Sequence, residues 1–254
     1  MSIQSLALLV VSLALAGCLG IGSAPAPNFV EVTPNPNIEQ VQFSTPDNWT
    51  LTGFFFKPLG PVNKSVVLLH TLGADKSSWG DLPATLQYSG FGVLVVDQRG
   101  HGDSFVNGRK KSYGTFTPED FQKMVDDAEA FATFFRERRP DDQVYFIGAS
   151  IGANAALNYA SRDENVTGVV MLSPGIDYRG VGTTQAITQY GKRPLLLIAS
   201  KGDEYSALSA KQLSEKSPSS RTTLQIVEGS GHGTGLLDAS PELKRQLGQW
   251  LVRN

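Results

Sequence analysis

The chain has almost no cysteine, because Cys18 is the only one among 254 residues. A single cysteine excludes a disulfide within the chain and a metal site built from several thiolates. Its place near the start of the chain also excludes a cysteine nucleophile in the folded body. Histidine is scarce as well, with three in all, so few residues are candidates for a general base near neutral pH.

An excess of charge of either sign is also absent. The sequence has 22 lysines and arginines against 24 aspartates and glutamates, a formal net charge of −2. This balance gives no indication of a nucleic acid partner. No spacing of histidines and carboxylates resembles a zinc site, and no glycine-rich loop fits a nucleotide, so no metal or cofactor is expected. What the chain does contain is 41% hydrophobic residues, enough for a large core.

The apolar run near the N-terminus, Leu6–Ala16, is too short for a permanent membrane span of about 20 residues. It leads into Leu15-Ala16-Gly17-Cys18, which resembles the lipobox of bacterial and archaeal lipoprotein signals. The resemblance implies a signal peptide over residues 1–17 and a lipid on Cys18 that attaches the protein to the extracytoplasmic face of the cell membrane. An ordinary cleaved signal and an uncleaved anchor are the alternatives, and both also place the domain outside the cytoplasm.

The next segment, residues 18–37, is rich in glycine, serine, alanine, proline and asparagine. Such a composition cannot build a core and predicts a flexible linker. Residues 38–254 are then expected to form one catalytic domain, a normal size for a single α/β domain.

Strand-like and helix-like segments alternate through the domain. An antiparallel pair is expected first, at residues 38–44 and 49–57. Buried strands, rich in valine, leucine and isoleucine without strict alternation, are predicted at residues 65–70, 92–97, 143–148, 167–173, 195–200 and 222–227. The clearest helix runs from Pro118 to about Arg139, with Thr117 and Asp120 as a capping box, and Ser240-Pro241-Glu242 opens the last helix in the same way. The alternation predicts a three-layer α/β sandwich around a mostly parallel sheet.

One motif carries a nucleophile. Gly148-Ala149-Ser150-Ile151-Gly152 stands between a predicted strand and a predicted helix. A strand that turns at once into a helix forces the serine into a strained backbone, and small residues two positions away on either side let the chains pass. In this context the motif resembles the nucleophile elbow of the α/β-hydrolase family, with Ser150 as nucleophile.

The resemblance also implies where the base and the acid lie, because the family has the chain order serine, acid, histidine. Only His232 follows Ser150, so it is the expected base. Asp203 follows the strand at residues 195–200 and is the expected acid. Asp177, which follows the preceding strand, is the rival, because some relatives place the acid there.

An acyl-transfer site also needs donors for the oxyanion of its tetrahedral intermediate. The resemblance assigns one donor to the N–H of Ile151 and the other to the loop His70-Thr71-Leu72-Gly73, with Leu72 as the donor and Thr71 as the fallback. The family commonly has glycine where Thr71 stands. His70 is expected to brace this loop.

A further signature, Asp97-Gln98-Arg99-Gly100-His101-Gly102-Asp103-Ser104, is similar to a turn found in many α/β-hydrolases, where its role is structural. The resemblance therefore covers residues 65–254. Residues 175–193 are too few for the helical cap domain that many lipases and peptidases insert there.

The expected protein is a serine esterase without a large cap domain, acting on a small-molecule ester through a Ser150–Asp203–His232 triad. A thioesterase, a lactonase similar to dienelactone hydrolase and a small peptidase are the alternatives on the same machinery. A non-catalytic, surface-anchored binding protein is an alternative of another class.

Overall fold

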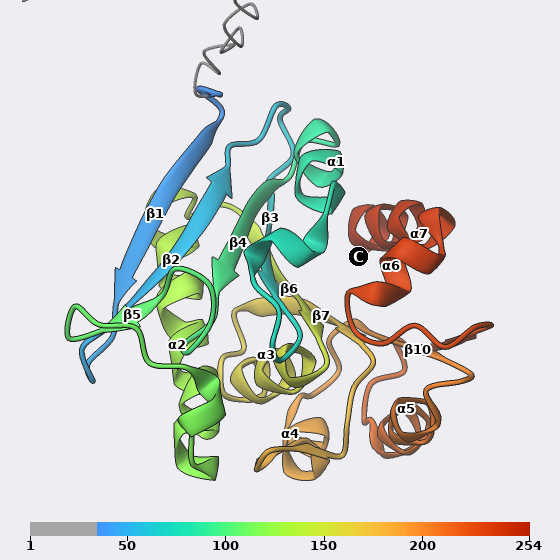
Figure 1. Cartoon of the computed structure of the whole chain (residues 1–254). Coiled ribbons are helices and arrows are strands. Elements are labelled where there is room, and N and C mark those ends of the chain that lie inside the picture. Colours follow the sequence, from blue (N-terminus) through green and yellow to red (C-terminus); the bar gives the residue numbers. More distant parts are fainter. Residues whose placement is uncertain (1–34) are drawn as a thin grey trace, which may run out of the picture. The chain divides into compact units, whose positions relative to one another are not determined.

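The computed structural model describes residues 35–254, so the predicted signal peptide and Cys18 lie outside the described residues. Nine strands form the main sheet, with the bounds β1 Ile38–Ser44, β2 Trp49–Phe56, β3 Lys64–Leu69, β4 Gly92–Asp97, β5 Phe105–Val106, β6 Gln143–Ala149, β7 Val166–Leu172, β10 Leu195–Ser200 and β11 Thr222–Val227. Eight of them follow the order β1-β2-β4-β3-β6-β7-β10-β11, and β5 pairs with β2 (Figure 1). The strand β2 runs antiparallel to its neighbours. Six strands run parallel to one another, namely β4, β3, β6, β7, β10 and β11.

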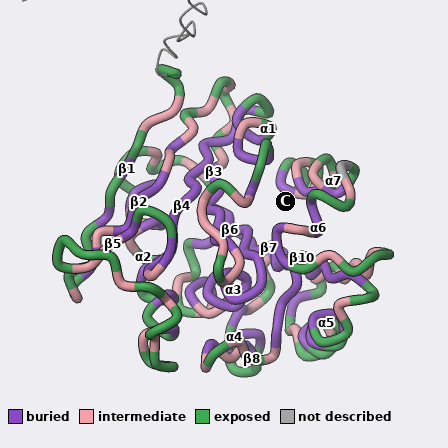
Figure 2. The backbone as a smooth tube through the Cα atoms, viewed as in Figure 1, coloured by how far each residue is buried: buried purple, intermediate pink, exposed green. Residues whose placement is uncertain are grey.

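Helices cover both faces of this sheet. Their bounds are α1 Leu82–Tyr88, α2 Pro118–Arg138, α3 Ile151–Arg162, α4 Thr184–Gln189, α5 Glu204–Lys216, α6 Gly235–Ala239 and α7 Pro241–Arg253. Buried side chains of α2, α3, α4 and α5 share one hydrophobic cluster with one face of the sheet, and those of α1, α6 and α7 share a second cluster with the other face. The three layers expected from the alternating pattern are therefore present, with the central strands buried between the helices (Figure 2).

The beginning of α2 follows from its sequence. The Thr117 side chain accepts the N–H of Asp120, and the Asp120 side chain accepts the N–H of Thr117, so the predicted capping box is confirmed. The expectation that Ser240 opens the last helix in the same way is wrong in part. The helix does begin at Pro241, but the Ser240 side chain makes no capping hydrogen bond.

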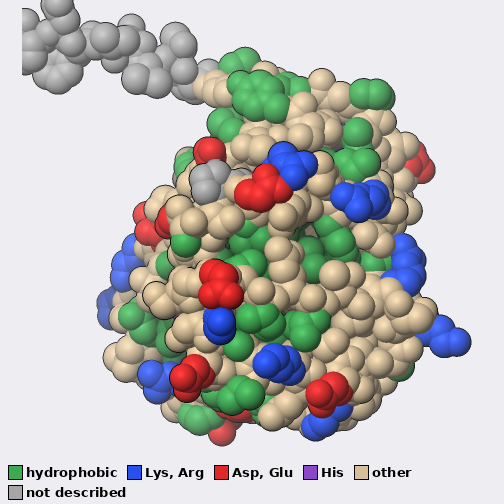
Figure 3. All heavy atoms as spheres, turned by 90° about the vertical axis from the view of Figure 1, so that its right-hand side faces the viewer, with side chains coloured by type: hydrophobic (Ala, Val, Ile, Leu, Met, Phe, Trp, Pro, Cys, Tyr) green, Lys and Arg blue, Asp and Glu red, His purple; other side chains and the backbone are tan. Residues whose placement is uncertain are grey.

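The segment between β7 and β10 is small. It holds a two-stranded hairpin, β8 Asp177–Tyr178 with β9 Val181–Gly182, followed by the short helix α4. No cap domain is present there, as its length predicted. In residues 35–254 no helix is both long and apolar enough to cross a bilayer. Figure 3 shows the face of the molecule that lies on the right in Figure 1. Acidic and basic side chains are interspersed on this face, without a large patch of one charge.

Candidate active site

Ser150 sits at the sharp turn between β6 and α3. Its backbone has φ 55° and ψ −121°, a conformation that side-chain-bearing residues rarely adopt. A Cβ on Gly148 would overlap the backbone of Gly152 and Ala153, and a Cβ on Gly152 would overlap the carbonyl oxygen of Leu69. The two glycines therefore let α3 leave the sheet directly behind the serine, which explains why the motif needs small residues at these positions.

The structure brings Ser150, His232 and Asp203 into one chain of hydrogen bonds. The Ser150 hydroxyl lies 2.8 Å from Nε2 of His232, and Nδ1 of His232 lies 2.6 Å from Oδ2 of Asp203. A carboxylate only accepts, so the Nδ1–H donates to Asp203 and Nε2 is left to accept the serine proton. The three residues stand at the C-terminal ends of β6, β10 and β11, the edge where open α/β sheets bind ligands.

Asp203 also caps the N-terminus of α5, in addition to its hydrogen bond with His232. It is the residue before α5, and its Oδ1 accepts the N–H of Ser206 at 3.4 Å. Burial alone would raise the pKa of Asp203, but the hydrogen bonds from Ser206 and His232 hold the pKa below its usual value. The carboxylate is therefore charged at neutral pH, as the orienter of a histidine must be.

The rival carboxylate, Asp177, is placed differently. It lies exposed on β8, where its Oδ1 accepts the N–H of Gly180 at 2.9 Å. Its backbone N–H and carbonyl both bond to the hydroxyl of Tyr205. Asp177 thus holds the hairpin turn, and the carboxylate hydrogen-bonded to His232 is that of Asp203.

The expected oxyanion donors come from two segments, Ile151 at the start of α3 and Leu72 in the loop after β3. Ile151 is the first residue of α3, so its N–H has no acceptor within the helix. The loop with Leu72 is held by two histidines. His70 Nδ1 lies 2.8 Å from the carbonyl of Thr71, and Nε2 of His101 accepts the N–H of Gly73 at 3.1 Å. Each histidine sets the direction of one peptide group beside Leu72, which agrees with the bracing role expected for His70.

Thr71, which stands where the family commonly has glycine, packs against Gly233. Thr71 Oγ1 is buried and has no hydrogen-bond partner in the described part of the chain. It lies against Gly233, the residue after His232, where an added Cβ would overlap it. Gly233 has φ 56°, so glycine is favoured there for its backbone as well. The threonine is accommodated because residue 233 has no side chain.

We expect Gly233→Ala to destabilise the fold by about 2–5 kcal/mol, since overpacking costs about 1–3 kcal/mol and the positive φ adds about 1–2. Adding Thr71→Gly should recover part of this loss, because it removes the overlapping hydroxyl but not the backbone strain. Urea unfolding of the two single variants and the double variant measures the coupling. Strictly additive effects would show that residues 71 and 233 do not meet.

The burial of His70 should make the free energy of unfolding depend on pH. The side chain is completely buried, and this burial lowers its pKa to about 4. The unfolded chain, with a histidine pKa near 6.5, therefore binds more protons between pH 6.5 and 4. Stability should accordingly fall as the pH drops through this window, by up to about 3 kcal/mol from His70.

Urea unfolding at a series of pH values measures this loss, and NMR titration of the ring protons reports His70 directly. Only three histidines need assignment. A His70 ring that titrates near pH 6.5 in the folded protein would contradict the prediction.

The remaining signature forms a structural turn, as expected. Buried Asp97 accepts the backbone N–H groups of Lys76 at 2.8 Å and Asp103 at 2.7 Å, together with the ammonium of Lys76 at 2.5 Å. A Cβ on Gly102 would overlap this carboxylate. Arg99 is buried and forms an ion pair with Asp127 in α2.

Several residues around His232 were not anticipated from the sequence. Ser173 accepts the N–H of Gly233 at 2.9 Å, and Ser200 donates to the carbonyl of Gly231 at 2.7 Å, so two buried serines hold the histidine loop on both sides. The ring of Tyr178 meets that of His232 edge to face at 6.2 Å. Tyr178 and the serines lie in unremarkable sequence and become neighbours only through the sheet. The described residues contain no cluster of potential metal ligands.

A model of the family described as serine aminopeptidase, S33, matches residues 60–190, just over half of the chain. No curated protein sequence gives a match.

Among solved structures, an esterase from Pyrococcus furiosus is similar with a TM-score of 0.68 and 21% identity, over 85% of this chain and 92% of its own. A dienelactone hydrolase from Anabaena variabilis gives a TM-score of 0.68 and 17% identity, over 85% and 98%. A monoacylglycerol lipase from Paleococcus ferrophilus gives a TM-score of 0.62 and 19% identity, over 85% and 98%. At these identities the similarity establishes a common fold, so the fold predicted from the sequence is confirmed.

Proposed function

The chain belongs to the serine aminopeptidase S33 family of α/β-hydrolases, and we propose that it is a serine hydrolase that cleaves carboxylic esters through an acyl-enzyme intermediate. The observation that carries the proposal is the continuous hydrogen-bonded chain from Ser150 through His232 to Asp203. A serine hydroxyl is a weak nucleophile unless a base removes its proton, and the base needs a partner that stabilises its charged form. His232 lies in contact with Ser150 and with the carboxylate of Asp203, which supports these roles.

In the first half-reaction, Ser150 Oγ attacks the acyl carbon of the ester while Nε2 of His232 takes the serine proton. The carbonyl oxygen becomes an oxyanion, for which the N–H groups of Ile151 and Leu72 are the proposed donors. The tetrahedral intermediate collapses as the bond to the alkoxy group breaks. His232 gives its proton to the departing oxygen, and an alcohol leaves.

In the second half-reaction, water takes the place of the alcohol. His232 removes a proton from the water, whose oxygen attacks the acyl carbon of the acyl-serine. The second tetrahedral intermediate collapses with release of Ser150, which recovers the proton from His232. The products are one carboxylic acid and one alcohol, and the enzyme returns to its starting state. Asp203 stays ionised throughout and stabilises the imidazolium.

Esters are favoured over amides by the structural neighbours. The hairpin β8–β9 and the short helix α4 leave the site without a large cap domain. The structurally similar proteins named above are an esterase, a dienelactone hydrolase and a lipase. The family description favours a peptidase as the second candidate. Thioesters and lactones are the other substrates open to the same machinery.

Initial rates on a matched substrate panel test the proposal. The panel contains p-nitrophenyl esters of increasing acyl length, an acyl thioester, a lactone and aminoacyl p-nitroanilides. We expect the highest kcat/KM on a p-nitrophenyl ester. A higher value on an aminoacyl anilide would replace the esterase with the peptidase. A folded protein that turns over nothing in the panel would favour a binding protein.

We further propose that the mature protein is a lipoprotein on the extracytoplasmic face of the membrane. Support comes from the sequence Leu15-Ala16-Gly17-Cys18. Wild-type protein should partition into the detergent phase of a Triton X-114 extraction, whereas Cys18→Ser should remain unprocessed. Mass spectrometry of the mature protein reports the N-terminus. An intact segment over residues 1–17 on the mature wild-type chain would rule out lipidation at Cys18.

A further inference from the structure

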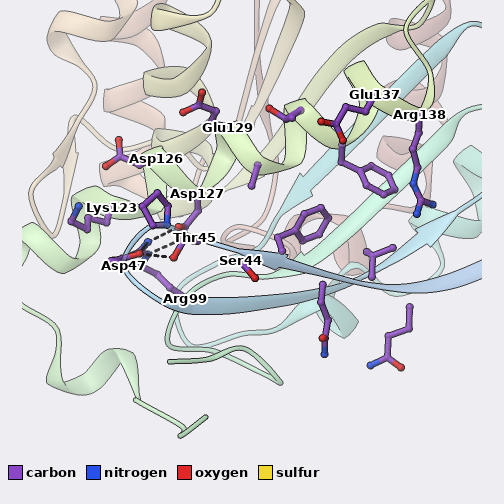
Figure 4. Close-up of a pocket in the computed structure, with 18 of the residues that line it drawn as sticks. Ser44, Thr45, Asp47, Arg99, Lys123, Asp126, Asp127, Glu129, Glu137 and Arg138 are labelled. Atoms are coloured by element: carbon purple, nitrogen blue, oxygen red, sulfur yellow. Dashed lines mark hydrogen bonds and ion pairs between the residues drawn. The ribbon is translucent and has the colours of Figure 1, made fainter. Parts of the chain in front are cut away.

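A large groove lies along the edge of the sheet opposite β11. It has a volume of about 1060 Å³ and runs between β1 and α2 (Figure 4). The strand and its following turn contribute the residues from Glu39 to Asp47, and α2 contributes residues between Lys123 and Arg138. Neither Ser150 nor the rest of the proposed triad lines it. The groove is therefore separate from the proposed active site and has no part in the ester chemistry.

The outer edge of β1 carries unpaired backbone groups. The N–H of Lys57 donates to the carbonyl of Asn37 at 2.8 Å, and hydrogen-bonded pairs alternate along an antiparallel ladder. The N–H and carbonyl groups of Gln40, Gln42 and Ser44 therefore point away from β2. Because β1 is the last strand of the sheet on this side, no strand within residues 35–254 pairs with them. Such an edge is a template for an additional strand.

The wall of the groove next to this edge is apolar. Val41 and Phe43 point from β1 towards α2 and are buried. The ring of Phe43 packs edge to face on Phe134 at 5.6 Å. Phe134 and the half-buried Ala130 both line the groove. An added strand would place alternate side chains over this surface and the others towards solvent.

The rim of the groove is acidic. Its lining contains six carboxylates and three basic residues, namely Glu39, Asp47, Asp126, Asp127, Glu129 and Glu137 against Arg99, Lys123 and Arg138. Two of the basic residues are already paired inside the protein. Arg99 contacts both Asp127 and Asp47, and Arg138 contacts Glu39.

Three exposed carboxylates stand on α2 next to β1, those of Asp126, Glu129 and Glu137 (Figure 4). Asp126 is paired with Arg162, so Glu129 and Glu137 are the carboxylates available to a ligand. A basic ligand would gain favourable electrostatic interactions here. A second copy of the chain would bring the same acidic rim against this one, which disfavours pairing between two β1 edges.

We propose that this groove binds an extended polypeptide segment with basic side chains at alternate positions, which adds to β1 as a further strand. The backbone groups of Gln40, Gln42 and Ser44 supply the main-chain hydrogen bonds, and the carboxylates of α2 select lysine or arginine. Strand addition gives affinity through the backbone and specificity through every second side chain. The basic side chains of the ligand are two residues apart because successive side chains of a strand point to opposite faces.

The test measures fluorescence anisotropy of a fluorescein-labelled octapeptide of alternating lysine and threonine. The full chain is used in a neutral detergent with Ser150→Ala present throughout, so that no hydrolysis of the probe enters the result. We expect saturable binding that Glu129→Gln/Glu137→Gln weakens at least five-fold. Gln42→Pro should weaken it at least ten-fold, because it removes an outward N–H without breaking a bond to β2.

Two controls separate strand addition from charge attraction alone. Glu164→Gln/Glu215→Gln removes the same charge from exposed sites outside the groove and should leave the affinity within two-fold. A probe of the same charge with alternate backbone amides methylated should bind at least ten-fold more weakly. The alternating glutamate–threonine octapeptide should not bind.

Three outcomes would overturn the proposal. They are absence of binding at millimolar probe, equal binding by the methylated probe, and equal losses in the groove and control variants. A dimer that Gln42→Pro dissociates, without probe binding, would assign the edge to contacts between copies instead. None of these readouts depends on hydrolysis, so their failure is distinct from failure of the proposed esterase function.

Discussion

Ser150→Ala is expected to lower kcat for the best ester substrate by about a million-fold, the size of loss seen when the nucleophile of a serine triad is removed. The hydroxyl makes the attack itself, so no neighbouring group can substitute for it. A fluorophosphonate probe should label wild-type protein once, at Ser150, and leave the variant unlabelled. Loss of esterase activity should follow labelling in proportion.

The fold should survive this change. Alanine keeps the Cβ and the positive φ of the turn, so the free energy of unfolding should change by less than about 1 kcal/mol. Ser161→Ala is the matched control, because it removes a serine hydroxyl from the last turn of α3. It should keep full activity and full labelling. Labelling of the Ser150→Ala protein at another serine would refute the assignment of the nucleophile.

Asp203→Asn should lower kcat by about ten-thousand-fold. The amide cannot stabilise the imidazolium, and it can turn its NH₂ group towards Nδ1, which then accepts and leaves Nε2 protonated. A base in that tautomer cannot take the serine proton. Steady-state kinetics on the same ester measure the loss, while KM should change little, because Asp203 lies behind the histidine.

Asp177→Asn is the matched control for this prediction. Both aspartates follow strands of the same sheet, but the Asp177 carboxylate accepts from Gly180 and does not contact His232. Its replacement should cost less than about three-fold in kcat. The assignment of the acid would be wrong if Asp177→Asn were the crippling change and Asp203→Asn stayed active. Unfolding curves for both variants exclude a trivial loss of structure.

The elbow and the positions of the main strands along the chain were predictable because their causes are local. The steric demands on Ser150 involve residues within a few positions of it, and the hydrophobic segments that form the strands are continuous in sequence. The capping box at Thr117 and Asp120 has the same local character and was confirmed. At Ser240 the side chain makes no capping bond, and Leu243 stands at the third helical position, where α2 has Asp120.

Other parts of the site come from contacts between distant segments. Thr71 departs from the usual glycine, and nothing near it in sequence explains why this is tolerated. The reason is Gly233, which packs against it from the other side of the site. Ser173, Ser200 and Tyr178 likewise reach the His232 loop only because β7 and β10 end at the same edge of the sheet.

The sequence by itself determined the fold class and the position of the serine, because hydrophobic periodicity and short-range steric limits depend on neighbouring residues. The choice of His232 followed from the chain order implied by the family resemblance. Between Asp203 and Asp177 it could offer only a chain order. The tertiary structure decided which carboxylate hydrogen-bonds to His232, since that depends on the parallel register of β10 with its neighbours and on the turn into α5. It also created the acidic groove beside β1, because an open edge exists only once all the other strands have found partners.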